Sequence, residues 1–414
     1  MKGSFISRRK RKRAAGVTVA VIAMGTVVAF LAGFWLFWML GSRVAGGDGL
    51  ALRLPGVHLP GGSVEAAIAA VPSDDTPFDL PVVDIAGFRD LSYVPVKGIH
   101  LTSWAAGSSK FLPAQLELAD ATEINAMVID LKEADGYVAY DSDVSLANEL
   151  ELEELRIKDI DELLATLREH GIVPIARIVC FKDPLLAARR PDLAVKDKNG
   201  GVWKDRQGRA YVNPYDRRVW EYLVELGEDA ADRGFREIQF DYVRFPSDGK
   251  ISNTVYPDKD GSMEDAIAGF LAFARERLAK KGVWVSADVF GLTVYVKDDL
   301  GIGQKIDKVA RNVDIVSPMI YPSHYETGSY GQKSPNAAPY EIITAAMKDA
   351  GRRLDGTGAI VRPWLQDFSL DNMPPKYGVE EVRAQIRAVE DLGYREWILW
   401  DPSVSYTEGA LARQ

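Results

Sequence analysis

The segment EIQFDYVRFP, residues 237–246, decides the fold of this chain. Alternate residues of a strand face opposite sides of its sheet, so Ile238 and Phe240 share one face while Gln239 and Asp241 share the other. A buried carboxylate without a partner costs several kcal/mol, so the polar face cannot lie against covering helices. The segment therefore predicts a strand packed between a layer of helices and a polar interior.

Seven further segments read as short apolar strands, and they lie at 96–103, 126–133, 173–181, 284–291, 314–322, 360–368 and 396–402. Amphipathic helical stretches separate the strands, near 113–124, 156–170, 216–233, 263–281, 303–311, 340–353 and 379–392. Strict alternation predicts a parallel sheet, and eight strands close a barrel. An open doubly wound sheet is the alternative, but no Gly-rich phosphate-binding turn follows the first strand. We therefore expect a (β/α)8 TIM barrel over residues 96–414.

The N-terminal residues predict a membrane anchor. Residues 1–13 hold seven cations and no acid, and residues 14–40 carry no charge at all. Such an apolar stretch is long enough to cross a bilayer as a helix, and preceding cations stay in the cytoplasm. We therefore expect a single-pass protein of the cytoplasmic membrane with its barrel outside. The alternative is a secreted protein with a cleaved signal peptide, although the apolar stretch exceeds the usual length of about 7–15 residues. Residues 41–95, rich in Gly, Pro and Asp, predict a linker or irregular collar.

Composition limits the ligands that the barrel binds. The seven N-terminal cations leave 43 of the 50 basic side chains beside all 59 acidic ones. An acidic body is unsuited to nucleic acid and favours a neutral or amino sugar over an anionic polymer. Four His residues show no metal-ligand spacing, so we expect no metal and no cofactor. The lone Cys180 allows no intrachain disulfide.

The polar faces of the strands bring ionisable side chains to one end of the predicted barrel. Asp241 and Asp288 lie on adjacent strands, which are about 4.8 Å apart. Paired carboxyl groups cleave glycosidic bonds at separations of roughly 5 Å with retention or roughly 6.5–9.5 Å with inversion. We therefore expect Asp241 and Asp288 to be catalytic. The side chains expected to bind substrate at the same end are His100, Asp130, Glu133, Arg177, Arg244, Tyr321, Arg362, Trp364, Gln366, Asp367 and Asp401.

Aromatic residues and long loops also gather at this end. Aromatic rings stack on the apolar faces of sugars, and the rings on strand ends or following loops are Trp104, Trp203, Tyr211, Tyr321, Tyr325, Trp364 and Trp400. The two longest loops, 182–214 and 247–262, leave the carboxyl ends of strands three and four, where barrel enzymes carry their chemistry. A substrate cleft is therefore expected there.

Four segments resemble a bacterial family of glycoside hydrolase domains that is distantly similar to α-amylase-type barrels: GIHLT at 98–102, VIDLKE at 128–133, FDYVRFP at 240–246 and RPWLQDF at 362–368. The resemblance covers most of residues 96–403. It implies a strand-four carboxylate as nucleophile or base, which falls on Asp241, and an acid from strand five or six, which falls on Asp288.

Two positions depart from the amylase pattern. Strand five carries Asp where amylases carry Glu, and Gln239 stands where they carry Arg. Glu133, Asp130 and Asp367 therefore stay open as partners of Asp241.

These observations predict a membrane-anchored glycoside hydrolase that acts on cell-envelope or extracellular polysaccharide. Asp241 would be the nucleophile or base and Asp288 the acid, while arginines at positions 177, 244 and 362 would position carboxylates or bind anionic sugar groups. A barrel that binds glycans without cleaving them, and serves envelope organisation, is the alternative. A lyase or deacetylase is a weaker one, since a deacetylase would need metal ligands.

Overall fold

The structure is a computed structural model that describes residues 93–413. The basic tail 1–13, the apolar stretch 14–40 and nearly all of the expected linker 41–95 lie outside this range. Within it, no helix combines the length and the apolar composition that a membrane span requires.

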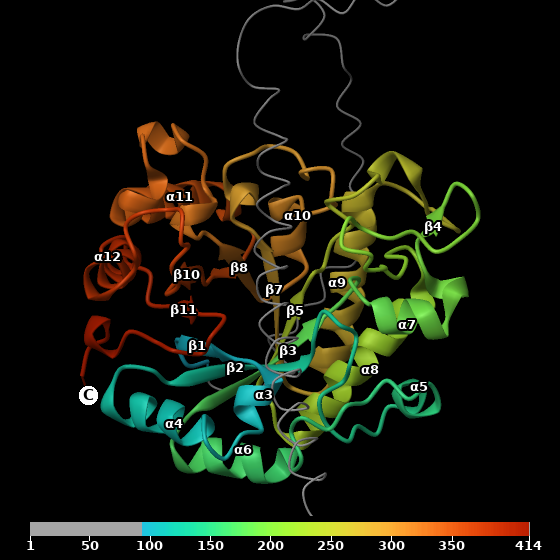
Figure 1. Cartoon of the computed structure of the whole chain (residues 1–414), viewed down its shortest axis with the longest axis horizontal. Coiled ribbons are helices and arrows are strands. Elements are labelled where there is room, and N and C mark those ends of the chain that lie inside the picture. Colours follow the sequence, from blue (N-terminus) through green and yellow to red (C-terminus); the bar gives the residue numbers. More distant parts are fainter. Residues whose placement is uncertain (1–92, 414) are drawn as a thin grey trace, which may run out of the picture. The chain divides into compact units, whose positions relative to one another are not determined.

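The strands form a closed parallel barrel, which confirms the predicted architecture (Figure 1). They are β1 Lys97–Leu101, β2 Ala126–Lys132, β3 Val173–Val179, β5 Glu237–Asp241, β7 Trp284–Phe290, β8 Ile315–Met319, β9 Ile360–Val361, β10 Trp364–Gln366 and β11 Trp397–Trp400. Their order is β10-β11-β1-β2-β3-β5-β7-β8-β9, and pairing of β10 with β8 at Trp364 and Met319 closes the ring. The predicted strand seven is divided into β9 and β10 around Pro363, which has no N–H for a ladder bond.

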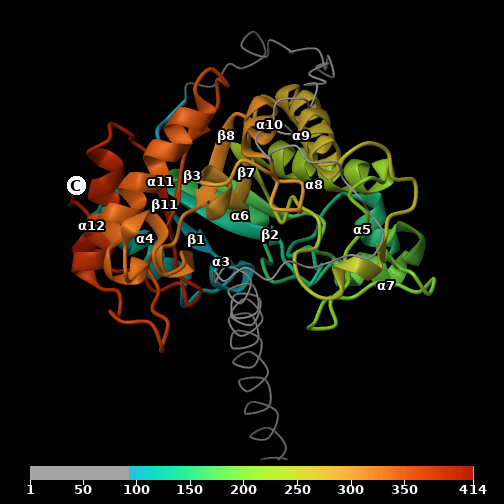
Figure 2. The ribbon, with the colours of Figure 1, turned by 90° about the horizontal axis from the view of Figure 1, so that it is seen from above.

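Helices surround the strands in Figure 1 and follow the predicted stretches closely. They are α4 Leu112–Ala121, α6 Ile160–Glu169, α8 Arg217–Arg233, α9 Met263–Ala279, α10 Ile306–Arg311, α11 Pro339–Leu354 and α12 Val379–Glu390. Figures 1 and 2 both show α8 beside α9 and α11 beside α12. Side-chain caps set several starts. For example, Asp216 accepts a hydrogen bond from the backbone of Arg218, and Gly234, at φ 120°, ends the same helix.

The loops carry short elements of their own. These are α3 Ser103–Ala106, α5 Ser145–Glu149, α7 Pro184–Arg189, β4 Lys196–Asp197 and β6 Thr254–Val255, with 3-10 helices at Pro191–Leu193, Ile251–Asn253, Gly291–Val294, Pro322–His324, Ser329–Gly331, Pro335–Ala337 and Glu408–Ala410. β4 and β6 pair antiparallel, so they join the two long loops after β3 and β5. A rim is thereby built over one side of the barrel.

Successive side chains of each strand point to opposite faces, so the apolar side chains form two separate clusters, one under the helices and one inside the barrel. On β7, Val285, Ala287 and Val289 face the helices and join the main core. The opposite faces supply a smaller cluster inside the barrel, which includes Val128, Ile175, Trp364 and Ile398. Strand parity therefore assigns faces as the sequence predicted.

A network of buried charges closes the amino-terminal end of the barrel, and we call Tyr93, Glu237, Arg362 and Glu396 the floor network. The Arg362 Nη1 lies 2.8 Å from Glu237 Oε1, and its Nε lies 2.8 Å from Glu396 Oε2. Its Nη2 donates to the Tyr93 hydroxyl at 3.0 Å. Arg362 is fully buried, and Glu237 is the first residue of β5.

The prediction that Arg362 reaches the carboxyl end of the barrel is therefore wrong. The alternation of side chains along the strand correctly assigned Arg362 to the inside of the barrel. Alternation does not tell at which end of the barrel an inward side chain lies. Arg362 lies four residues before Gln366, which corresponds to roughly 13 Å along an extended chain.

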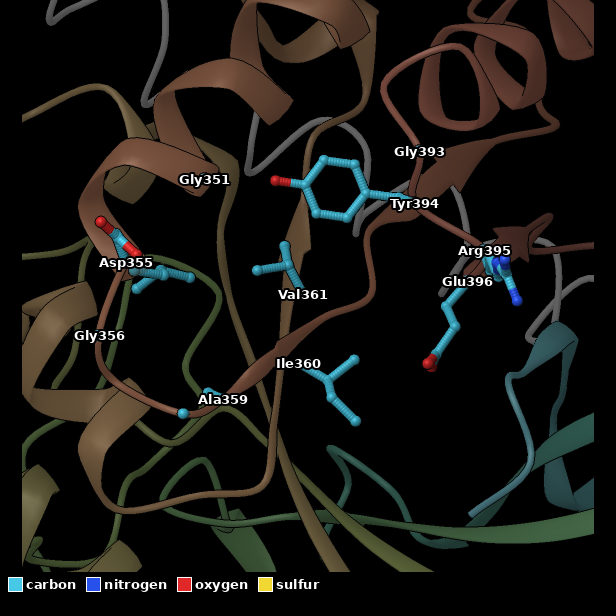
Figure 3. Close-up of a pocket in the computed structure, with 12 residues that line it drawn as sticks. Gly351, Asp355, Gly356, Ala359, Ile360, Val361, Gly393, Tyr394, Arg395 and Glu396 are labelled. Carbon is cyan, nitrogen blue, oxygen red and sulfur yellow. The ribbon is translucent and has the colours of Figure 1, made fainter.

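A cavity of about 460 Å³ opens beside the floor network (Figure 3). Its lining includes Ile360 and Val361 of β9 and Tyr394 and Glu396 ahead of β11. These residues begin a strand or lie just before one, so the cavity lies at the end of the barrel opposite the predicted site.

Replacing Arg362 with Met should destabilise the protein by about 3–5 kcal/mol, because Glu237 and Glu396 would be left buried without their cation. Urea unfolding of the full chain in detergent, followed by tryptophan fluorescence, measures the loss. The matched control is Arg395→Met, which removes an exposed arginine nearby and should leave the unfolding midpoint almost unchanged. Equal effects of the two substitutions would contradict the assigned structural role of Arg362.

Candidate active site

The carboxyl ends of β2, β5 and β7 bring three carboxylates around one guanidinium from β3. Arg177 pairs with both Asp130 and Asp241, with its Nε 3.1 Å from Asp241 Oδ2. The same Nε lies 3.8 Å from Asp288 Oδ2. All four side chains are at least nine-tenths buried. The parallel register aligns Asp130 with Arg177, and Val179 with Asp241. The pairing of the strands therefore brings these charged side chains together.

The separation of Asp241 and Asp288 follows from their shared neighbour. Because Arg177 Nε lies 3.1 Å from one Oδ2 and 3.8 Å from the other, these two oxygens are at most about 6.9 Å apart. This limit covers the spacing of retaining glycosidases and the short end of the inverting range.

The surroundings of Asp288 favour its protonated form. Its carboxyl is almost completely buried, and Oδ1 accepts a hydrogen bond of 2.6 Å from the indole N–H of Trp364. Burial, and then the negative charge of Asp241, raise the pKa of Asp288 well above its ordinary value.

Asp130 has the opposite character. Burial opposes its ionisation, but the charges of Arg177 and His100 lower the pKa of Asp130 to about 2. The cluster therefore combines a carboxyl group whose pKa is raised with one whose pKa is lowered, which is the pairing that acid/base catalysis uses.

Aromatic rings surround this charged cluster. The His100 Nε2 lies 3.0 Å from Asp130 Oδ2, and the His100 ring packs against Trp400 with centroids 4.1 Å apart. The Trp400 and Trp364 rings meet edge to face at 5.8 Å. Together they form an apolar wall that orients the polar groups.

Tyr321 lies beside the same cluster, two residues after the end of β8. Its ring meets Phe368 edge to face at 5.5 Å. Burial, and then the nearby Asp288 and Asp241, raise the pKa of Tyr321, so its hydroxyl keeps its proton and is able to donate.

Glu133 and Arg244 lie at the edge of the cluster. Glu133 accepts a hydrogen bond from Ser103 and lies 3.1 Å from Arg156 Nη1. Burial and the charge of Asp130 raise the pKa of Glu133, so it keeps the properties of an alternative acid. Arg244 lies in the loop after β5, where its guanidinium covers the rings of Tyr242 and Phe290.

The last three predicted residues hold loops in place. Gln366 is fully buried, and its amide donates to the Phe368 carbonyl at 2.9 Å and accepts from the Ser323 N–H at 3.1 Å. The structure thus gives Gln366 a role in joining two loops, rather than the substrate contact that was predicted.

Two carboxylates near the C-terminus also hold a loop in place. Asp367 accepts hydrogen bonds from the backbone and hydroxyl of Thr407, at 2.8 and 2.6 Å, and burial raises the pKa of Asp367 to about 6. Asp401 accepts from the backbone of Ser403 at 2.6 Å, and burial raises the pKa of Asp401. Both side chains shape the segment 401–407.

Sequence reasoning did not identify Tyr242 and Tyr406 as parts of the site. The Tyr406 hydroxyl donates to the His100 carbonyl at 2.6 Å, across most of the chain, and no local pattern signals this contact. Tyr242 adopts φ 48° directly after Asp241. A non-glycine residue in this region stores about 1–3 kcal/mol of strain, and such residues gather at functional sites. Tyr242 could have been recognised from the sequence because it directly follows Asp241, the carboxylate that ends β5.

Residues 98–406 match a family model described as "Putative glycosyl hydrolase domain". The chain belongs to this family. No curated protein matches the chain. Among solved structures, a hypothetical protein from Ruminiclostridium thermocellum ATCC 27405 is 38% identical over 49% of this chain and 98% of its own, with a TM-score of 0.43.

Two further solved structures share the barrel. The glycoside hydrolase domain of PgaB (BpsB) from Bordetella bronchiseptica is 12% identical over 77% of this chain and 99% of its own, with a TM-score of 0.55. The β-galactosidase from the psychrophilic Marinomonas ef1 is 14% identical over 76% of this chain, which spans 57% of that enzyme, with a TM-score of 0.52. At these identities the likeness shows the fold of this glycosyl hydrolase domain and nothing finer.

The raised pKa of Asp288 should fall when Asp241 is replaced by Asn, because a negative charge beside it disappears. Infrared difference titration of the full chain follows the C=O band of the protonated carboxyl, which Asp288→Asn assigns by its loss. Asp367→Asn is the control, since it removes a separate band that titrates near pH 6. A band of Asp288 that titrates at the same pH with and without Asp241 would contradict the electrostatic coupling.

Proposed function

We propose that this family member hydrolyses glycosidic bonds of a cell-envelope or extracellular polysaccharide, with Asp241 as nucleophile or base and Asp288 as general acid. One observation carries the proposal: a carboxyl with a strongly raised pKa stands within about 6.9 Å of a second carboxyl on the adjacent strand. The family assignment supports the same reaction class.

In the proposed reaction, Asp288 gives its proton to the oxygen of the leaving sugar. Asp241 either attacks the anomeric carbon or activates a water molecule. Arg177 holds Asp241 in place through their ion pair, and the Trp364 N–H holds one Asp288 oxygen so that the other faces the substrate. If Asp241 becomes covalently bound, it loses its negative charge. The pKa of Asp288 then falls, which prepares Asp288 to accept a proton from water in the second step.

A binder that does not cleave is the second candidate. The observation that favours it is the very low exposure of Asp288, which is 1%, because a general acid must touch the glycosidic oxygen. The same cleft would serve both functions, so only a measurement of turnover separates them.

Asp241→Asn and Asp288→Asn should each reduce hydrolysis by about 10²–10⁴-fold, because each removes one proton-transfer or bond-forming group. Reducing-sugar release by the full chain in detergent, over a panel of envelope glycans and α-glucans, measures the loss. Asp161→Asn, on the exposed first turn of α6, is the matched control and should keep full activity.

Other outcomes would support a different general acid or a glycan-binding function without cleavage. Full activity of Asp288→Asn together with loss in Glu133→Gln would move the acid role to Glu133. Retained glycan binding with no release by the unmodified protein on any glycan would favour the binder.

We propose further that residues 14–40 anchor the protein in the cytoplasmic membrane, with residues 1–13 inside and the barrel outside. The proposal is supported by the long uncharged stretch and the cations that precede it. No cofactor is needed by the proposed reaction.

Protease added to intact spheroplasts should degrade the barrel and spare the first thirteen residues, because the bilayer shields only the cytoplasmic side. Immunoblotting of a tag on each end reads the result. Replacing the cations at positions 8–13 by Gln should weaken this orientation. Recovery of an N-terminally truncated protein in the medium would instead indicate signal cleavage.

A further inference from the structure

A second group of charged side chains lies beside the three carboxylates, and we call Lys182, Arg209 and Arg244 the cationic cluster. Lys182 follows β3, Arg244 follows β5, and Arg209 belongs to the long loop between them. Arg244 is 6% exposed, and its Nη1 donates to the carbonyl of Phe245 at 3.0 Å. Within residues 93–413, Arg244 forms no ion pair with a carboxylate. A buried guanidinium that no carboxylate neutralises favours an anionic ligand over a neutral one.

The guanidinium of Arg244 packs on the two aromatic rings that follow the proposed catalytic pair in the chain. It lies 4.7 Å from the ring centroid of Phe290 and 4.9 Å from that of Tyr242. Phe290 lies two residues after Asp288 on the same face of β7, which is about 7 Å along the strand. Tyr242 directly follows Asp241. Arg244 therefore contacts residues that closely follow the two proposed catalytic carboxyl groups in the chain, on the loop side of the pair.

Lys182 shares the Tyr242 ring with Arg244. Its Nζ is 4.6 Å from the ring centroid, and the residue is almost completely buried. Burial, and then the positive charges of Arg209 and Arg244, lower the pKa of Lys182 to about 7. A negatively charged ligand would relieve this repulsion.

The charge of the surroundings limits the ligand. Arg209 lies 3.1 Å from Asp205, and burial together with the charge of Asp205 raises the pKa of Asp248. Asp205 offsets one cation, and Asp248 offsets a second when it is ionised, so the cluster then keeps about one positive charge. A single carboxylate fits that balance better than a dianion, and guanidinium groups bind carboxylates through paired hydrogen bonds.

We propose that the cationic cluster binds the carboxylate of an acidic sugar residue next to the bond cleaved by Asp241 and Asp288. This inference rests on the proposed hydrolase function and names its substrate class. It reverses the expectation of a neutral or amino sugar that the acidic composition suggested. Net charge acts through solvent that screens it beyond about 8–10 Å, whereas Arg244 would act at contact.

Binding of matched glycan pairs to the full chain in detergent tests the inference. The probes are oligosaccharides of hyaluronan, alginate, galacturonan and peptide-free peptidoglycan, each beside its carboxyl-reduced neutral form. Measurement in the Asp241→Asn background prevents cleavage. At least one carboxylated probe should bind about tenfold or more tightly than its neutral form, and Arg244→Gln should remove that difference.

Two further variants make the result specific. Arg244→Lys keeps a charge and should retain part of the preference, which a merely structural arginine would not. Arg217→Gln, an exposed arginine stacked 3.7 Å from Trp220 on α8, should change nothing.

Equal binding within every pair, no binding of any carboxylated probe, or a preference that survives Arg244→Gln would each overturn the proposal. Because binding and turnover are measured separately, the two proposals fail separately. Hydrolysis of neutral glycans by the unmodified protein, without a carboxylate preference, would reject only the acidic sugar. A carboxylate preference without hydrolysis would reject only the enzyme.

Discussion

The arrangement of this site follows from one guanidinium that three carboxyl groups share. Arg177 supplies one positive charge to Asp130, Asp241 and Asp288 in a setting that is almost free of solvent. Three ionised carboxylates around one cation would leave two buried negative charges, which costs several kcal/mol each. The least costly solution is to leave one acid protonated. Asp288 is that acid, because it is the most buried and the farthest of the three from Arg177.

The two ends of the barrel use buried arginines in opposite ways. At the amino-terminal end, Arg362 donates to two glutamates and one tyrosine, so its donors are used inside the protein. At the other end, acids outnumber the single arginine that holds them, and Arg244 has no carboxylate partner within the described residues. Acids outnumber the arginine at both ends, with two glutamates beside Arg362 and three aspartates beside Arg177. The candidate site is distinguished by its third carboxyl group, Asp288, which lies farther from the arginine and has a raised pKa.

The barrel was predictable because its signal is local. Short apolar strands alternate with amphipathic helices, and strand parity places Asp241 and Asp288 inward without knowledge of any contact. Parity does not give the height of a side chain in the barrel, which depends on register, and this is why Arg362 was assigned to the wrong end. The hydrogen bonds from Trp364 to Asp288 and from Tyr406 to His100 join residues distant in the chain. No spacing in the sequence encodes such contacts, so the pKa of Asp288 could not be derived from the sequence.

Chemistry and selectivity are divided between strands and loops, and Tyr242 connects the two. The proposed catalytic carboxyl groups stand on strands whose ladder fixes them, whereas Lys182, Arg209 and Arg244 stand on loops. Tyr242 continues the chain from Asp241, adopts a strained backbone conformation, and presents its ring to both Lys182 and Arg244. A ligand that draws these cations toward itself would change the contacts of the Tyr242 ring. The Tyr242 N–H also donates to the Asp241 carboxylate, so one residue contacts both the proposed catalytic pair and the cationic cluster.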